Sequence, residues 1–128
     1  MILIDADILI DLFRGYPPAI QWFNSLDEQA VRVPGFVAMQ LLEGCLNKQA
    51  EQRTYRLLDD YELIWPTEKD YSRAVAGYGD RRLKFGLDVI DALIAEIAIG
   101  VGAPLYTFNL KHFVAFEQLS TVQPYPKN

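Results

Sequence analysis

Cysteine and histidine are almost absent from this sequence, which contains Cys45 and His112 and no other residue of either kind. A single cysteine excludes an internal disulfide and suits a reducing compartment such as the cytoplasm. One cysteine and one histidine also cannot supply the usual ligand set of a zinc site. We therefore interpret Cys45 as a packing residue.

Long apolar runs are missing as well. No run reaches the ~18–20 residues that a membrane span needs. The first apolar segment has no basic region before it and is interrupted by Asp5, Asp7 and Asp11, which predicts no signal peptide. We expect a cytoplasmic protein that does not enter a membrane.

An excess of positive charge is the third absence, because 12 Lys and Arg residues face 17 Asp and Glu residues, for a net charge of −5. This balance argues against a general nucleic-acid coat. It is compatible with an enzyme that meets RNA through a metal ion and a local basic patch. Arg81, Arg82 and Lys84 are the candidate RNA-binding patch, although a solvated helix face explains them at least as well.

The chain of 128 residues is long enough to bury its own core, and we expect a single domain over residues 1–128. Short apolar runs predict strands at 1–4, 31–33, 62–65 and 105–107, and Val122 is a candidate edge position. Asp7 is the expected N-cap of the first helix. Helices are predicted at about 8–13, 17–26, 38–46, 51–60, 66–84 and 88–99. Strands that alternate with helices predict an α/β fold with a mostly parallel central sheet flanked by helices.

Acidic and polar side chains follow two of the predicted strands. Asp5 and Asp7 come at the carboxyl end of the first strand, and Thr107 and Asn109 at the end of a later one. In open α/β sheets, ligands bind outside the carboxyl ends of the strands. These residues are therefore expected at one edge of the sheet, where a functional site would lie.

Three more acids have unusual surroundings. Asp88 and Asp91 begin a helix that is apolar nearly all round, and a helix of this kind is buried. An acid in the first turn complements the helix dipole, which explains Asp88 as an N-cap. Asp91 lies deeper, where an unpaired carboxylate costs several kcal/mol. Glu43 follows an apolar helical stretch and has Gly44 beside it, where another backbone can approach.

The acids Asp5, Glu43 and Asp91, with Asp7 and Asp88 as further candidates, would repel one another if they met. Repulsion of this kind raises pKa values unless a cation is present. Mg²⁺ and Mn²⁺ prefer carboxylate oxygens and keep several waters. Such an ion activates water and holds a phosphodiester for in-line attack. The sequence therefore favours a divalent-metal site of carboxylates.

Three segments in order resemble one known family: "ILIDADILIDLF", "AMQLLEGC" and "IDALIAEIAIGVGAPLYTFNLKHF". Together they are similar to PIN-domain ribonucleases, and within these to the VapC toxins of VapBC toxin–antitoxin modules. The resemblance implies one PIN-like domain and a Mg²⁺- or Mn²⁺-dependent endoribonuclease. It implies Asp5, Glu43 and Asp91 as catalytic acids and metal ligands, with Asn109 and Thr107 in support.

The resemblance also implies partners: an RNA substrate, with transfer RNA and ribosomal RNA both open, a cognate antitoxin and a second copy of the chain. We expect the homodimer to form through the N-terminal helices, because Trp22, Phe23 and Tyr55 add more apolar surface than one sheet face can cover. In this family Asn is frequent at the position of Asp7, and an acid is common at that of His112. We interpret His112 as a surface packing residue.

Two other functions remain open at this point. "DAD" after a first strand resembles haloacid dehalogenase-like phosphatases, with Asp5 as nucleophile and Asp7 as acid/base, although Glu43 would then have no role. A receiver-like signalling module also has an acidic pocket with Mg²⁺. That module needs an Asp at the end of a middle strand, and none follows 31–33 or 62–65.

Overall fold

The centre of the protein is a five-stranded sheet. A computed structural model describes residues 1–26 and 30–127. Within them the strands are β1 (Ile2–Ile4), β2 (Val31–Pro34), β3 (Glu62–Ile64), β4 (Leu105–Tyr106) and β5 (Thr121–Val122). Their order is β3-β2-β1-β4-β5, and every neighbouring pair is parallel. The predicted α/β fold with a mostly parallel sheet is confirmed.

Seven helices connect the strands in the described part of the chain. They are α1 (Ala6–Phe13), α2 (Pro17–Asn24), α3 (Gly35–Glu43), α4 (Lys48–Leu58), α5 (Glu68–Phe85), α6 (Val89–Val101) and α7 (Leu110–Phe113). Their ends follow local chemistry: Thr67 and Asp70 form a capping box before α5, and Gly102 ends α6 in the left-handed region at φ 68°. The prediction did not include α7, and it began α4 too late because it missed Asn47, whose side chain caps that helix.

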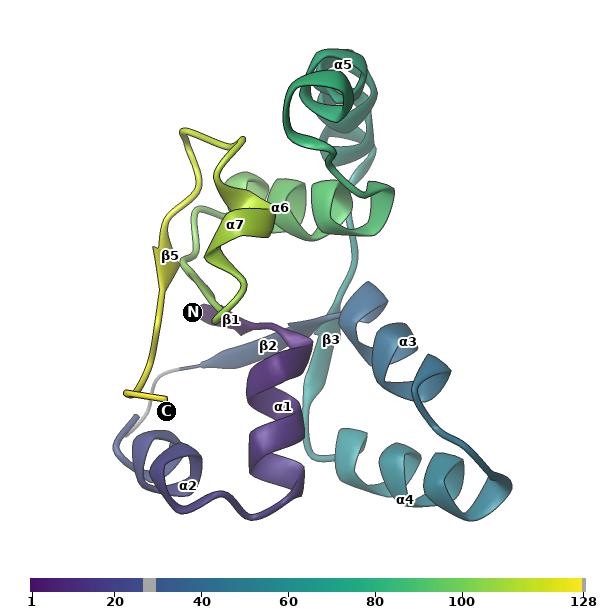
Figure 1. The fold of residues 1–128 in the computed structure, drawn as a ribbon, viewed down its shortest axis with the longest axis vertical. Helices are drawn as coiled ribbons and strands as arrows, with labels where there is room; N and C mark the ends of the chain where they lie inside the picture. The colour runs from purple at the N-terminus through teal and green to yellow at the C-terminus, as the bar shows by residue number, and fades with distance from the viewer. Residues whose placement is uncertain (27–29, 128) are drawn as a thin grey trace.

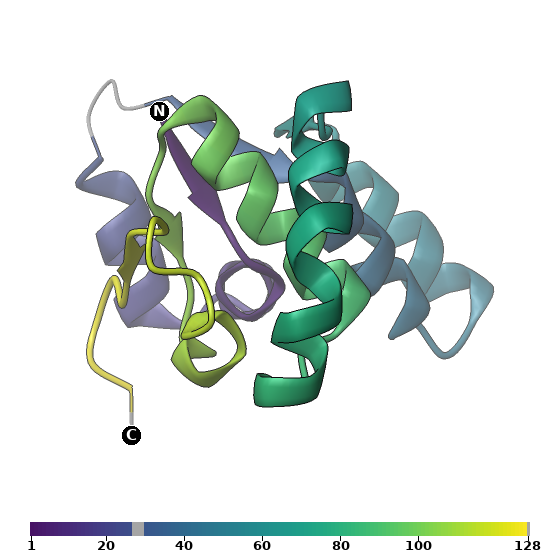
Figure 2. The same cartoon turned by 90° about the horizontal axis from the view of Figure 1, so that it is seen from above.

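The helices form two layers around the sheet. Figure 1 shows α5, α6 and α7 on one side, and α1, α2 and α4 on the other. Figure 2 shows α5 running across α6 in the outer layer, and the two helices pack against each other. Helix α3 contacts both α1 and α6, so it joins the two layers. No helix in residues 1–26 and 30–127 is long and apolar enough to cross a membrane.

The core lies where β1 and α6 meet. Leu3, Ile4, Ile94 and Ile97 have no exposed surface, as expected for a central strand and a helix that is apolar all round. Glu96 is an exception within that helix, because its buried carboxylate reaches toward α5.

One expectation about exposed aromatic residues is wrong. Trp22 does not lie free on the surface: its ring is 5.4 Å from that of Tyr106 and 6.1 Å from that of Tyr125. Phe23 packs near Tyr61, with ring centres 6.0 Å apart. The C-terminal segment covers α2, and helix periodicity alone cannot predict this. Of the three aromatics that motivated an N-terminal dimer, only Tyr55 is exposed.

Candidate active site

Asp5 and Thr107 form the centre of the candidate site. Strands β1 and β4 pair with Ile4 opposite Tyr106, so the residues that follow lie side by side at the sheet edge. The Thr107 hydroxyl donates a hydrogen bond to Asp5 Oδ2 at 2.8 Å, and the Ala6 amide donates to Oδ1 at 2.8 Å. Asp5 is only 4% exposed. Both carboxylate oxygens are therefore held in place by donors.

Asp5, and not Asp7, is the N-cap of α1, so the predicted cap is wrong. The chain enters the helix directly after β1, which leaves Asp7 inside the first turn. Its Oδ1 accepts from the Ile8 amide, and its Oδ2 accepts from the Phe108 amide, 101 residues further on, both at 2.8 Å. Asp7 thus ties the segment after β4 to α1.

Asp91 approaches this edge from the first turn of α6. Asp88 is the N-cap of that helix and accepts from the Ile90 amide at 3.0 Å, as the sequence predicts. His112 of α7 lies with Nδ1 3.3 Å from Asp91 Oδ2. His112 therefore has a specific acidic partner, which its interpretation as a surface packing residue missed.

The acids at this edge are costly to ionise. Burial raises the pKa of Asp5 above its ordinary value, and the charge of Asp91 raises it further, against hydrogen bonds from Ala6 and Thr107 that lower it. Burial also raises the pKa of Asp7, with the charge of Asp5 as a second cause. Burial raises the pKa of Asp91 as well. Three neighbouring carboxyls thus share too little positive charge.

This electrostatic imbalance is the observation that tests the fit of a divalent cation. Hard cations prefer carboxylate oxygens, and the charge of Asp91 already raises the pKa of Asp5. Glu43 is the last residue of α3 and is exposed. Within the described residues, no three Asp, Glu, His or Cys side chains are arranged to hold a metal ion. The donor chemistry of Asp5 and Asp91 fits a cation, and the role of Glu43 stays a prediction.

The other predicted site residues lie at different distances from this centre. The backbone amide of Asn109 donates to Thr107 Oγ1 at 3.0 Å, so Asn109 lies next to the centre of the site. Arg81, Arg82 and Lys84 lie in the last turns of α5, outside the acid cluster. Their predicted role in RNA binding stays a prediction.

The sequence indicates Val122 as an edge position, where β5 lies, but it gives no sign of the contacts that Tyr125 and Lys127 make after this strand. The Tyr125 hydroxyl donates to Asp11 Oδ2 at 2.7 Å, and Lys127 Nζ lies 2.8 Å from the same oxygen. Lys127 Nζ is also 4.8 Å from the centre of the Phe108 ring, and its charge lowers the pKa of Asp7. Residues this far apart in the chain carry no local pattern that would connect them. The segment covers Phe108, whose amide binds Asp7.

The chain is similar to known proteins over most of its length. The PIN domain family matches residues 2–117. Ribonuclease VapC10 from Mycobacterium tuberculosis is 32% identical over 122 residues, which cover 93% of this chain and 90% of that protein. Ribonuclease VapC19 from the same organism is 30% identical over 124 residues, covering 93% and 97%. A solved toxin-antitoxin complex from Klebsiella pneumoniae matches with a TM-score of 0.75 and 29% identity, over 98% of each chain.

Proposed function

The chain belongs to the PIN-domain family, and on this premise we propose that it is a Mg²⁺- or Mn²⁺-dependent endoribonuclease acting as the toxin of a toxin–antitoxin module. The observation that carries the proposal is the group of acids near the carboxyl end of β1, where Asp5 is buried and the charge of Asp91 raises its pKa. The curated relatives are named ribonucleases. One of the similar solved structures is a toxin-antitoxin complex.

The proposed catalytic residues are Asp5, Glu43 and Asp91, which would hold the cation, with Asp7 and Asp88 as weaker candidates. A bound divalent cation supplies a water of lowered pKa and a positive charge for the scissile phosphate. Asp5 and Asp91 would bring their carboxylate oxygens to it. Asp88 caps α6 through the Ile90 amide, and this contact favours a structural role for it.

Neighbouring residues orient the proposed ligands. The Thr107 hydroxyl holds Oδ2 of Asp5, and His112 holds Oδ2 of Asp91. Asp7 fixes the loop after β4 through the Phe108 amide. Positioning of this kind limits the motion of groups that must meet a phosphate, which lowers the entropic part of the barrier. Thr107 and Asn109 therefore have a supporting role in the proposal.

A haloacid dehalogenase-like phosphatase is the alternative, with Asp5 as nucleophile and Asp7 as acid/base. Asp7 argues against it, because both of its oxygens accept hydrogen bonds from backbone amides. A general acid has to place a proton on the leaving group, within hydrogen-bond reach. An Asp7 held in this way is a loop anchor instead. The family match also disfavours this alternative.

The partners of this proposed toxin are an RNA substrate and a cognate antitoxin, and its compartment is the cytoplasm. Transfer RNA and ribosomal RNA are both candidate substrates. The similar Klebsiella pneumoniae structure is a toxin–antitoxin complex, which supports a cognate antitoxin as a partner. Sequencing of RNA ends after pulsed expression identifies the substrate.

Cleavage of RNA in vitro is the direct test of the proposed function. We expect the purified protein to cut structured RNA in the presence of Mg²⁺ or Mn²⁺ and to stop when EDTA removes the ion. Asp91→Asn should lower the rate by at least about a hundredfold, because it removes a charge at the reacting phosphate. Hydrolysis of p-nitrophenyl phosphate that beryllium fluoride inhibits, with RNA left intact, would instead support the phosphatase.

We also propose that the chain forms a homodimer, through the outer face of α5 and α6. Tyr71, Val75 and Val89 are exposed on this face, Val75 with 79% of its surface. They line an apolar groove of about 350 Å³ between the two helices. Exposed apolar patches on soluble proteins often mark interfaces. This face replaces the N-terminal helices, whose Trp22 is covered within the protomer.

Val75→Asp is expected to convert the dimer to a monomer, because it places a charge inside an apolar interface. The dimer dissociation constant should rise by roughly thirtyfold or more. Multi-angle light scattering across a concentration series measures this. Leu46→Asp is the matched control, since Leu46 is 95% exposed away from this face and should leave the mass unchanged. A wild-type monomer at high micromolar concentration would refute the dimer.

A further inference from the structure

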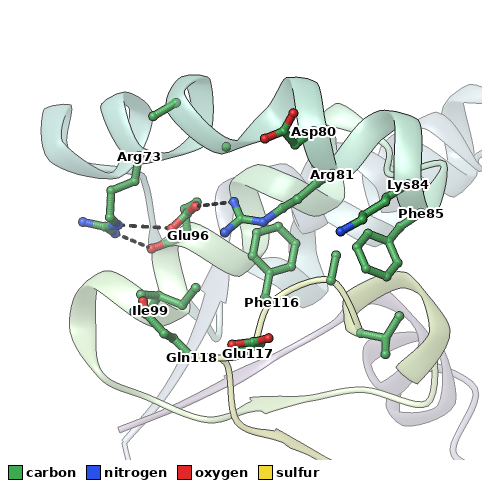
Figure 3. Close-up of a pocket in the computed structure, with 14 residues that line it drawn as sticks. Arg73, Asp80, Arg81, Lys84, Phe85, Glu96, Ile99, Phe116, Glu117 and Gln118 are labelled. Atoms are coloured by element: carbon green, nitrogen blue, oxygen red, sulfur yellow. Dashed lines mark hydrogen bonds and ion pairs between the residues drawn. The ribbon is translucent and has the colours of Figure 1, made fainter.

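A cleft of about 600 Å³ lies between the second half of α5, α6 and the segment after α7. Figure 3 shows Arg73 and Glu96 together at one end, and Lys84 and Phe85 together at the other. Its volume is within the roughly 300–1,000 Å³ of small-molecule sites. None of the catalytic roles proposed above uses this cleft.

Arg81 forms a fixed, flat surface between the two ends. Its Nη1 lies 3.6 Å from Glu96 Oε2, and its guanidinium carbon lies 4.5 Å from the centre of the Phe116 ring. The carboxylate balances its charge and the ring supports its plane. A planar guanidinium held in this way is suited to stacking more than to binding phosphate as a free charge.

Lys84 and Phe85 give the near end of the cleft a different character. Phe85 is 51% exposed, and Lys84 takes part in none of the ion pairs of the described residues. An open aromatic ring beside an uncompensated ammonium matches single-stranded nucleic acid, whose bases stack on rings while phosphates bind cations. Arg73 and Arg81 pair with Glu96, and Asp80 and Glu117 also line the cleft. Lys84 is therefore the cation of the cleft that is most available to a phosphate.

This end of the cleft is adjacent to the candidate active site along two stretches of chain. Phe85 ends α5, and the chain turns at Gly86 into the N-cap of α6, whose first turn carries Asp91. On the other side, His112 contacts Asp91, and Phe116 of the cleft comes four residues later. Only a few residues of chain thus connect the acids with this cleft, which is compatible with one RNA strand reaching both.

We propose that the cleft binds one unpaired nucleotide of the RNA substrate that flanks the scissile bond, with the base against Phe85 and Arg81 and a phosphate on Lys84. The proposal rests on the proposed ribonuclease function and adds a substrate subsite to it. It requires an unpaired base, because a paired base has no free face to stack. The subsite thus selects loops and single-stranded segments over duplex.

Binding is tested with cleavage-deficient Asp5→Asn protein and a fluorescently labelled single-stranded RNA of mixed sequence, by anisotropy. Phe85→Ala should weaken binding by roughly tenfold, from the loss of one stacked base. Lys84→Ala should reduce the slope of log Kd against log salt by about 0.7, for one lost phosphate contact. Leu83→Ala is the matched control, since its side chain is exposed on the same helix and does not line the cleft.

A blunt RNA duplex of the same sequence provides the second comparison, and Phe85→Ala should leave its binding unchanged. If Phe85→Ala and Leu83→Ala weaken the binding of single-stranded RNA equally, the subsite is refuted. It is also refuted if Phe85→Ala changes the oligomeric mass of the protein but leaves its RNA affinity unchanged. Cleavage by the otherwise wild-type protein is measured separately. Binding that follows this pattern without any cleavage would refute the ribonuclease and keep the subsite, whereas no RNA binding at all would refute the subsite.

Discussion

Asp5→Asn is expected to abolish RNA cleavage while leaving the metal-free protein at least as stable as the wild type. The amide keeps the shape of the side chain, and its oxygen can still accept the hydrogen bond from the Ala6 amide. Its NH₂ group can donate to the Thr107 hydroxyl, because that hydroxyl can rotate. The substitution removes the negative charge of a residue that is 4% exposed and whose pKa the charge of Asp91 raises.

The stability gain should depend on pH. Burial raises the pKa of Asp5 above its ordinary value of 3.8, so the native state binds this proton more tightly than the unfolded state. The free energy of unfolding of the wild type therefore falls as the pH rises through the interval between the two pKa values. Asp5→Asn has no such loss. Its advantage should be present at pH 7 and vanish below about pH 4.

Melting curves with and without Mn²⁺, together with the RNA cleavage assay, check this prediction. The wild type should gain stability on adding Mn²⁺, Asp5→Asn should lose most of that gain, and its cleavage rate should fall at least about a hundredfold. Binding to the antitoxin should survive, because that surface is larger than the site.

Asp11→Asn is the matched control for this substitution. Asp11 is a buried carboxylate on the same helix, but it pairs with Tyr125 and Lys127. Its replacement should lower stability and leave RNA cleavage intact. A well-folded Asp5→Asn protein that still cuts RNA at near the wild-type rate would refute the mechanism.

Arg73→Ala is expected to destabilise the protein although Arg73 lies outside the candidate site. Arg73 Nη2 binds Asp70 Oδ1 at 2.6 Å, and its Nε binds Glu96 Oε1 at 3.2 Å. Asp70 and Glu96 are each 3% exposed. Removal of the shared cation leaves two buried carboxylates with poorer compensation. The Arg73 side chain is itself 39% exposed, and Arg81 still lies 3.6 Å from Glu96, so the loss should cost about 1–3 kcal/mol and lower Tm by roughly 3–10 °C in a domain of this size.

The backbone around this network leaves little room to adjust. Gly100 of α6 lies so close to Asp70 that a Cβ there would collide with the carboxylate. The two helices therefore cannot shift easily to admit water. Arg73→Lys should lose less stability than Arg73→Ala, because it keeps the positive charge. It should still be less stable than the wild type, because lysine lacks the fork of N–H groups that binds both acids.

Urea unfolding at neutral pH measures the effect of Arg73→Ala. Arg82→Ala is the control, because Arg82 is exposed on the same helix and should change stability by no more than about 0.5 kcal/mol. An Arg73→Ala deficit under about 1 kcal/mol would show that water compensates the two acids.

The sequence by itself determined the elements whose causes are local. The apolar run before Asp5 predicts β1, Thr67 predicts the start of α5, and Asp88 predicts the N-cap of α6, and each is where the pattern indicates. Hydrophobic periodicity and capping act over a few residues, so they are legible along the chain. The resemblance to PIN-domain ribonucleases adds catalytic roles for Asp5, Glu43 and Asp91, and these roles stay predictions.

Only the tertiary structure decided the contacts between distant segments. The register of β1 with β4 sets Thr107 beside Asp5, 102 residues away in the chain. Asp7 accepts a hydrogen bond from the backbone amide of Phe108 and does not cap α1 as predicted. The buried carboxylate of Glu96 pairs with Arg73. Each contact depends on how strands pair and helices pack, and the free energy of such packing is shared over many residues. No local pattern therefore records which side chains will meet.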